Sequence, residues 1–173
     1  MTFRRTLAAA LALAAALPGV ALAAGTHEGG HGHGDAGHGH GGAQHGMMEI
    51  GQPATGAPGR TVEITMRETD DGRMIFEPGD LSFQPGETVR LKITNAGESE
   101  HEFVMDTMHA IAEHKALMEK FPEMEHDDPN AVRLSPGETG EILWTFGASG
   151  KFGYACLIPG HYDAGMHGPL HVN

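Results

Sequence analysis

Residues 60–173 form a series of short segments with strand character, separated by turns rich in glycine and proline. Apolar and polar residues alternate from Thr61 to Met66 and from Thr88 to Thr94, the pattern of a strand with one buried face. Pro78-Gly79 and Pro85-Gly86 mark turns. Further strands are expected at 74–76, 81–83, 102–105, 132–134, 141–146, 152–157 and 169–172, with Pro169 at the first position of the last. Such a series predicts an all-β domain, either a sandwich or a barrel.

The segment 106–128 interrupts this pattern, because it contains no glycine and is rich in alanine, glutamate, lysine and methionine. Met108, Ile111 and Met118 recur at helical spacing, which predicts a helical insertion that ends near Lys120. These three residues are expected to pack on the β-domain. The alternative is a metal site in the insertion, for which the candidates are His109, His114 and His126.

The amino-terminal 23 residues are typical of an export signal. Arg4 and Arg5 precede an apolar run from Leu7 to Leu17, and Ala21-Leu22-Ala23 resembles a cleavage site. The run is too short to span a bilayer as an anchor. We therefore expect a signal peptide at 1–23, and a mature protein in the periplasm of a Gram-negative bacterium.

Residues 24–59 differ from the rest of the chain in composition. Glycine is interleaved with six histidines, His27, His31, His33, His38, His40 and His45. Large apolar residues are scarce, so we expect a disordered tail that ends in a hinge at 52–59, with the folded domain beginning at residue 60. Histidine-rich tracts bind metal more often than they act as plain linkers, and copper, nickel and zinc all suit imidazole. The tail is therefore a candidate site for additional copper.

Cys156 is the single cysteine of the chain, and His161 and Met166 follow it at intervals of five residues. A free thiol in an exported protein is a liability unless a ligand occupies it. Thiolate, imidazole and thioether together suit a mononuclear copper held by two histidines, a cysteine and a weak axial methionine. His101 is the candidate for the second histidine. Zinc is the rival metal, but it favours harder or more numerous ligands than a distant thioether.

Several motifs resemble the cupredoxins, the plastocyanin/azurin superfamily. They are Phe76-Glu77-Pro78, Pro85-Gly86-Glu87-Thr88-Val89, Asn95 followed by His101, Pro136-Gly137-Glu138-Thr139 and the Cys156–Met166 loop. The resemblance implies a Greek-key β-sandwich with one type 1 copper site at one end, bound by His101, Cys156, His161 and Met166. Many cupredoxins carry asparagine immediately after the first histidine ligand, where it braces the ligand loop, whereas this chain carries Glu102.

Export, a histidine-rich tail and the insertion together resemble periplasmic cupredoxins linked to copper tolerance. The expected function is to bind copper, and to cycle it between Cu(I) and Cu(II), with a redox or copper-handling protein as partner. The alternative is an electron carrier of a respiratory or photosynthetic chain. An enzyme is disfavoured, because oxidases and nitrite reductases need further copper centres. The net charge of −12 argues against binding to nucleic acid or anionic membranes.

Overall fold

The computed structural model describes residues 48–124 and 127–173. The predicted signal peptide, the six tail histidines and His126 lie outside these residues.

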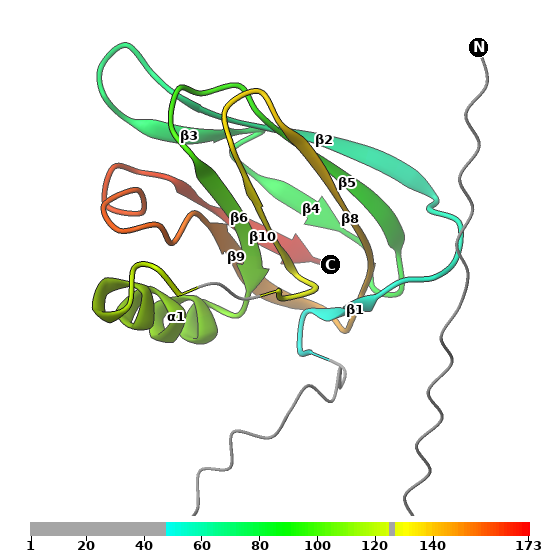
Figure 1. Cartoon of the computed structure of the whole chain (residues 1–173). Coiled ribbons are helices and arrows are strands. Elements are labelled where there is room, and N and C mark those ends of the chain that lie inside the picture. The colour runs from blue at the N-terminus through cyan, green and yellow to red at the C-terminus, as the bar shows by residue number, and fades with distance from the viewer. Residues whose placement is uncertain (1–47, 125–126) are drawn as a thin grey trace, which may run out of the picture. The chain divides into compact units, whose positions relative to one another are not determined.

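Within the described residues, ten strands form two five-stranded sheets that pack as a β-sandwich (Figure 1). In order across the first sheet lie β1 (Gly51–Pro53), β8 (Thr139–Phe146), β5 (Thr88–Asn95), β2 (Arg60–Glu68) and β3 (Met74–Glu77). The second sheet contains β4 (Leu81–Phe83), β10 (His167–Val172), β9 (Gly150–Ala155), β6 (His101–Asp106) and β7 (Ala131–Leu134). The chain crosses repeatedly between the sheets, as in a Greek key. The prediction of an all-β sandwich is confirmed.

The core lies between the sheets and is built from the inward-facing residues of alternating strands. In β5 every second residue is buried, and Val89, Leu91 and Ile93 are fully enclosed. Aromatic side chains fill the space between the layers, with Phe76 edge-on to Tyr154 at a centroid distance of 5.1 Å. An edge-to-face pair of aromatic rings stabilises the core beyond the burial of apolar surface alone. The result is a rigid support for the loops at the strand ends.

The folded domain begins earlier than the predicted boundary at residue 60. Ile50 is completely buried in the core, and β1 pairs antiparallel with β8, placing Gln52 opposite Thr145. The Trp144 indole N–H donates a hydrogen bond to the Ile50 carbonyl at 3.4 Å. The expected hinge at 52–59 therefore needs correction, because its first two residues belong to a strand.

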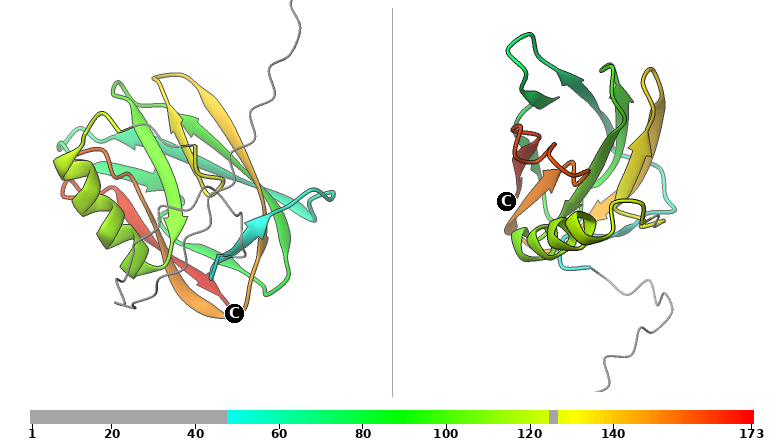
Figure 2. Two further views of the ribbon diagram at one scale, coloured as in Figure 1. Left: turned by 60° about the horizontal axis from the view of Figure 1, so that its bottom comes forward. Right: turned by 60° about the vertical axis from the view of Figure 1, so that its left-hand side comes forward.

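The predicted insertion contains helix α1 (Met108–Lys120), which follows β6 and precedes β7 in the chain and lies beside the second sheet (Figures 1 and 2). The Thr107 hydroxyl caps the helix by accepting a hydrogen bond from the Ala110 N–H. Ile111 and Met118 are buried, as predicted, against residues of β6 and of the end of β9. Met108 packs on the sheet only in part, because its sulfur lies against Gly153 of β9 while the residue is 51% exposed at the first helical position. The described parts of the chain contain no helix long and apolar enough to cross a membrane.

Several strand ends differ from the predicted ones, and two of them concern the candidate ligands. β6 begins at His101 instead of residue 102, and β9 ends at Ala155, so Cys156 is the first residue of the following loop. β10 begins at His167, which puts Pro169 at the third position of the strand. Proline is tolerated there because the pairing of β10 with β4 starts only at Leu170.

Candidate metal centre

Three of the four predicted ligands meet where β6 begins and β9 ends. His101 is the first residue of β6, Cys156 directly follows β9, and His161 lies in the loop between β9 and β10. One ligand atom of each lies within 4.8 Å of the others. His101 and Cys156 are fully buried, whereas His161 is partly exposed. Because β6 and β9 are paired neighbours, the sheet itself holds the first two side chains side by side.

The separations between these atoms fit a bound transition-metal ion. His101 Nδ1 and His161 Nδ1 lie 3.2 Å apart, and Cys156 Sγ lies 3.4 Å from His161 Nδ1. Metal bonds to imidazole and thiolate are about 2.0 and 2.3 Å long, so ligand atoms around one ion lie about 3 to 4 Å apart. Each of the two imidazoles thus directs its Nδ1 atom toward a common point. Two imidazoles and one thiolate are the ligand set expected for copper.

The loop that carries His161 and Met166 is closed by its own backbone. The Cys156 N–H donates to the Met166 carbonyl at 3.0 Å, and the Met166 N–H donates to the His161 carbonyl at 3.1 Å. Gly160 and Gly165 adopt φ angles of +90° and +99°, which side chains disfavour, and so permit the tight turns. Met166 is fully buried. The loop therefore folds the predicted axial residue back beside the cysteine.

Residues 62–173 match the copper binding proteins of the plastocyanin/azurin family. The chain belongs to this family. The cofactor is therefore copper in a type 1 site, and the ligand-like side chains described above fit it.

Proteins named for copper resistance are similar to most of the chain. The copper-resistant cuproprotein CopI of Rubrivivax gelatinosus is 41% identical over 146 residues, which cover 84% of this chain and 86% of that protein. CopI of Vibrio cholerae is 34% identical over 120 residues, covering 69% and 70%. Among solved structures, auracyanin B is similar with a TM-score of 0.56 and 27% identity, covering 70% of this chain and 94% of that one.

Burial sets the protonation of the candidate ligands. Burial raises the pKa of the Cys156 thiol to about 12, and the hydrogen bond from the Glu102 N–H offsets this only in part. Burial lowers the pKa of His161 and of His101, in both cases against the opposing effect of Glu68. Without metal, the site thus holds a neutral thiol and neutral imidazoles at pH 7, so both imidazoles can accept an ion without losing a proton.

Copper uptake should therefore release about one proton at pH 7, since only the thiol must ionise to bind. The apparent affinity should rise about tenfold per pH unit above neutrality, as long as the pH stays below the thiol pKa. Calorimetry in buffers of different ionisation enthalpy counts the released protons. The Cys156→Ser protein is the control and should release none. Copper uptake by the natural protein without proton release would contradict this account.

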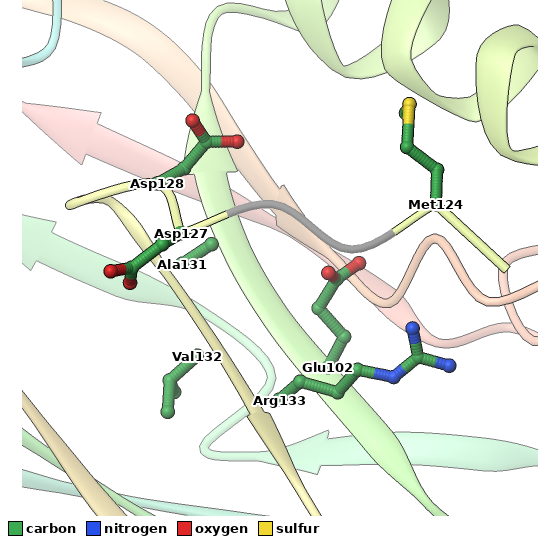
Figure 3. Close-up of a pocket in the computed structure, with 7 residues that line it drawn as sticks. All are labelled: Glu102, Met124, Asp127, Asp128, Ala131, Val132 and Arg133. Carbon is green, nitrogen blue, oxygen red and sulfur yellow. The ribbon is translucent and has the colours of Figure 1, made fainter. Parts of the chain in front are cut away.

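Glu102 braces the ligand loop from the position that asparagine occupies in many cupredoxins. Its backbone N–H donates to Cys156 Sγ at 3.3 Å, and its buried carboxylate accepts from the Leu157 N–H at 3.3 Å. The same side chain lines a pocket of about 250 Å³. Figure 3 shows Glu102 and Arg133 at one end of this pocket, with Asp127 and Asp128 at the other. The carboxylate thus does the bracing for which the family commonly uses an amide.

Within the described residues, the helical insertion provides no group of three His, Cys, Asp or Glu side chains close enough to share an ion. Across residues 48–124 and 127–173, one group of His, Cys, Asp or Glu side chains meets this condition, and it consists of His101, Cys156 and His161. His109 instead lies 3.5 Å from Glu113 on the exposed face of α1. Within this part of the chain, the packing role predicted for Ile111 and Met118 is the one that the structure shows.

Sequence reasoning missed one residue beside the candidate ligands. Glu68, the last residue of β2, places its carboxylate 3.1 Å from His101 Nε2, the ring nitrogen that faces away from the other ligands. Burial raises the pKa of Glu68, but hydrogen bonds from the backbone of Glu98 and from Ser99 outweigh it and lower the pKa to about 2. No local pattern marks this residue, because its partners lie far away along the chain.

Proposed function

We propose that this protein is a periplasmic copper-resistance cupredoxin that binds copper through His101, Cys156, His161 and Met166 and cycles its oxidation state. The observation that carries the proposal is the 41% identity to a copper-resistant cuproprotein over 84% of the chain. The resemblance of residues 1–23 to a signal peptide supports export. Export places the protein in the compartment that copper enters first.

The four ligands have distinct chemical roles in this proposal. The thiolate and thioether suit Cu(I), and the two imidazoles also suit Cu(II), so the site accepts both states. The paired strands hold His101 and Cys156, and the loop hydrogen bonds hold His161 and Met166. A site assembled before the metal binds changes little between the two oxidation states. The partly exposed His161 offers the shortest route for an electron to enter or leave.

Deletion of the gene should make cells sensitive to copper while growth at low copper stays nearly normal. The measurement is growth across a copper series, with the natural protein restored from a plasmid as the positive control. Because redox cycling needs the intact site, Cys156→Ser should restore no tolerance although the protein accumulates normally. Full restoration by Cys156→Ser would show that sequestration, and not the redox-active site, provides tolerance.

An electron carrier is the second candidate, since an enclosed site with one histidine near the surface also serves one-electron transfer. The similarity to auracyanin B, a 27% identical structure, is compatible with either role. A carrier would give the opposite phenotype, a defect in energy metabolism at ordinary copper and normal copper tolerance. In either role we propose that the protein is not an enzyme, because one mononuclear site supplies one electron at a time.

The tail should bind copper independently of the type 1 site. A variant without residues 24–47, which removes all six tail histidines, should bind less Cu(II) at pH 7 and keep the visible spectrum unchanged. The extra binding should weaken below about pH 6.5, because protons compete for imidazole. Metal analysis after dialysis against Cu(II) measures this. Equal copper content with and without the tail would contradict the proposal.

A further inference from the structure

The Glu68 carboxylate makes two contacts with the segment that precedes β6 and one with His101, the first residue of β6. Its Oε1 accepts from the Ser99 N–H at 3.0 Å and its Oε2 from the Glu98 N–H at 2.9 Å. Its Oε1 also lies 3.1 Å from His101 Nε2. Glu68 comes from β2 of the first sheet and His101 from β6 of the second. One side chain thus connects the two sheets at the candidate metal centre.

The chain leaves space for this carboxylate at Gly97. A Cβ atom built on Gly97 would overlap the Glu68 carboxylate and would lie 2.9 Å from His101 Nε2. Gly97 is therefore required because a side chain would not fit there. Its φ angle lies outside the left-handed region, so the backbone conformation gives no separate reason for glycine. The turn itself has a second support, because Asn95 accepts from the Gly97 N–H at 2.9 Å and donates to the Ser99 carbonyl at 2.8 Å. Because Asn95 already holds the turn, stabilisation of the turn does not explain why the Glu68 carboxylate also contacts His101.

The two nitrogens of His101 face different partners. Nδ1 points to His161 Nδ1 at 3.2 Å, among the candidate ligands, and Nε2 points to the Glu68 carboxylate. A carboxylate oxygen can only accept, so this contact places the ring proton on Nε2. The lone pair of Nδ1 is then free for a metal ion. A carboxylate that accepts the second N–H of a ligand histidine also makes the imidazole more basic, which favours the more highly charged ion.

We propose that Glu68 is the positioning residue of the copper site. It fixes His101 as the Nε2–H tautomer, orients Nδ1 toward the metal and stabilises Cu(II) relative to Cu(I). The inference rests on the proposed role of His101 as a ligand, but the tautomer belongs to the metal-free protein and can be tested separately. Gly97 keeps the space in which this contact forms.

The decisive variant is Glu68→Gln, compared with Glu63→Gln as a matched control. Glu63 lies on the same strand and its replacement deletes the same charge, but its partner is Lys92 at the surface. The amide introduced by Glu68→Gln has one accepting oxygen, which cannot serve two backbone N–H groups and an imidazole. We expect Cu(II) affinity to fall about 10- to 100-fold. If Cu(I) affinity falls tenfold less than Cu(II) affinity, the reduction potential rises by about 59 mV. The control should leave the potential at its natural value.

Two further measurements keep the test independent of how well Glu68→Gln folds. Nitrogen-15 NMR of the metal-free natural protein should show the His101 proton on Nε2, and a proton on Nδ1 would overturn the proposal. Gly97→Ala, which retains Glu68, should shift the potential in the same direction because it displaces the carboxylate. A natural potential in folded Glu68→Gln would also overturn it. A type 1 spectrum that survives His101→Gln would instead refute the ligand assignment, while the tautomer result would still stand.

Discussion

The Cys156→Ser protein should lose the intense visible absorption of the copper form completely. The band arises from charge transfer between thiolate and Cu(II), and Cys156 is the one cysteine that the chain contains. A serine oxygen at this position can take over neither the charge transfer nor the soft character that holds Cu(I). The optical spectrum after addition of Cu(II) and removal of excess metal measures the effect.

Met166→Leu is the matched control at the other end of the loop. Its side chain is buried like that of Cys156, and leucine has a similar volume, so the fold should persist. The variant should keep copper and colour, with a shifted spectrum and a raised potential, because an axial thioether tunes the site without creating the band. A visible band in Cys156→Ser, or a colourless Met166→Leu with bound copper, would contradict the ligand assignment.

Ile50→Ala should reduce the free energy of unfolding by about 2 to 5 kcal/mol, although the residue directly precedes a segment with the composition of a linker. Ile50 is completely buried, and its carbonyl accepts from the Trp144 indole. Truncation to alanine leaves a cavity against the core. Urea unfolding of the domain followed by tryptophan fluorescence measures the loss, and Trp144 is the single tryptophan of the chain.

Gln52→Ala is the control, because Gln52 lies on the same strand with an exposed side chain. Its replacement should change stability by less than about 0.5 kcal/mol. Equal stability of Ile50→Ala and Gln52→Ala would show that β1 does not support the domain. The result also decides how tail deletions are made, because a deletion that extends through Ile50 would destabilise the domain and obscure its effect on copper binding.

Local patterns predicted most of the fold. Alternation with period two marks β2 and β5, because one face of each strand is buried. Helical spacing located α1 and its last residue, Lys120. The candidate ligands were also visible, because the Cys156–Met166 loop carries three soft or borderline ligands in one short stretch of the chain. In each case the signal lies in neighbouring residues, where backbone geometry or ligand chemistry acts directly.

Partners that are distant in the chain were decided by the tertiary structure alone. β1 has only three residues, and two of them are glycine and proline. It forms because it can pair with the edge of β8, which lies far along the chain. In the sequence, Glu68 is simply a polar residue at the end of a strand, and its contact with His101 forms only when the two sheets pack together. A short strand or a single carboxylate has no periodicity of its own, and its role depends on which surface the folded chain places against it.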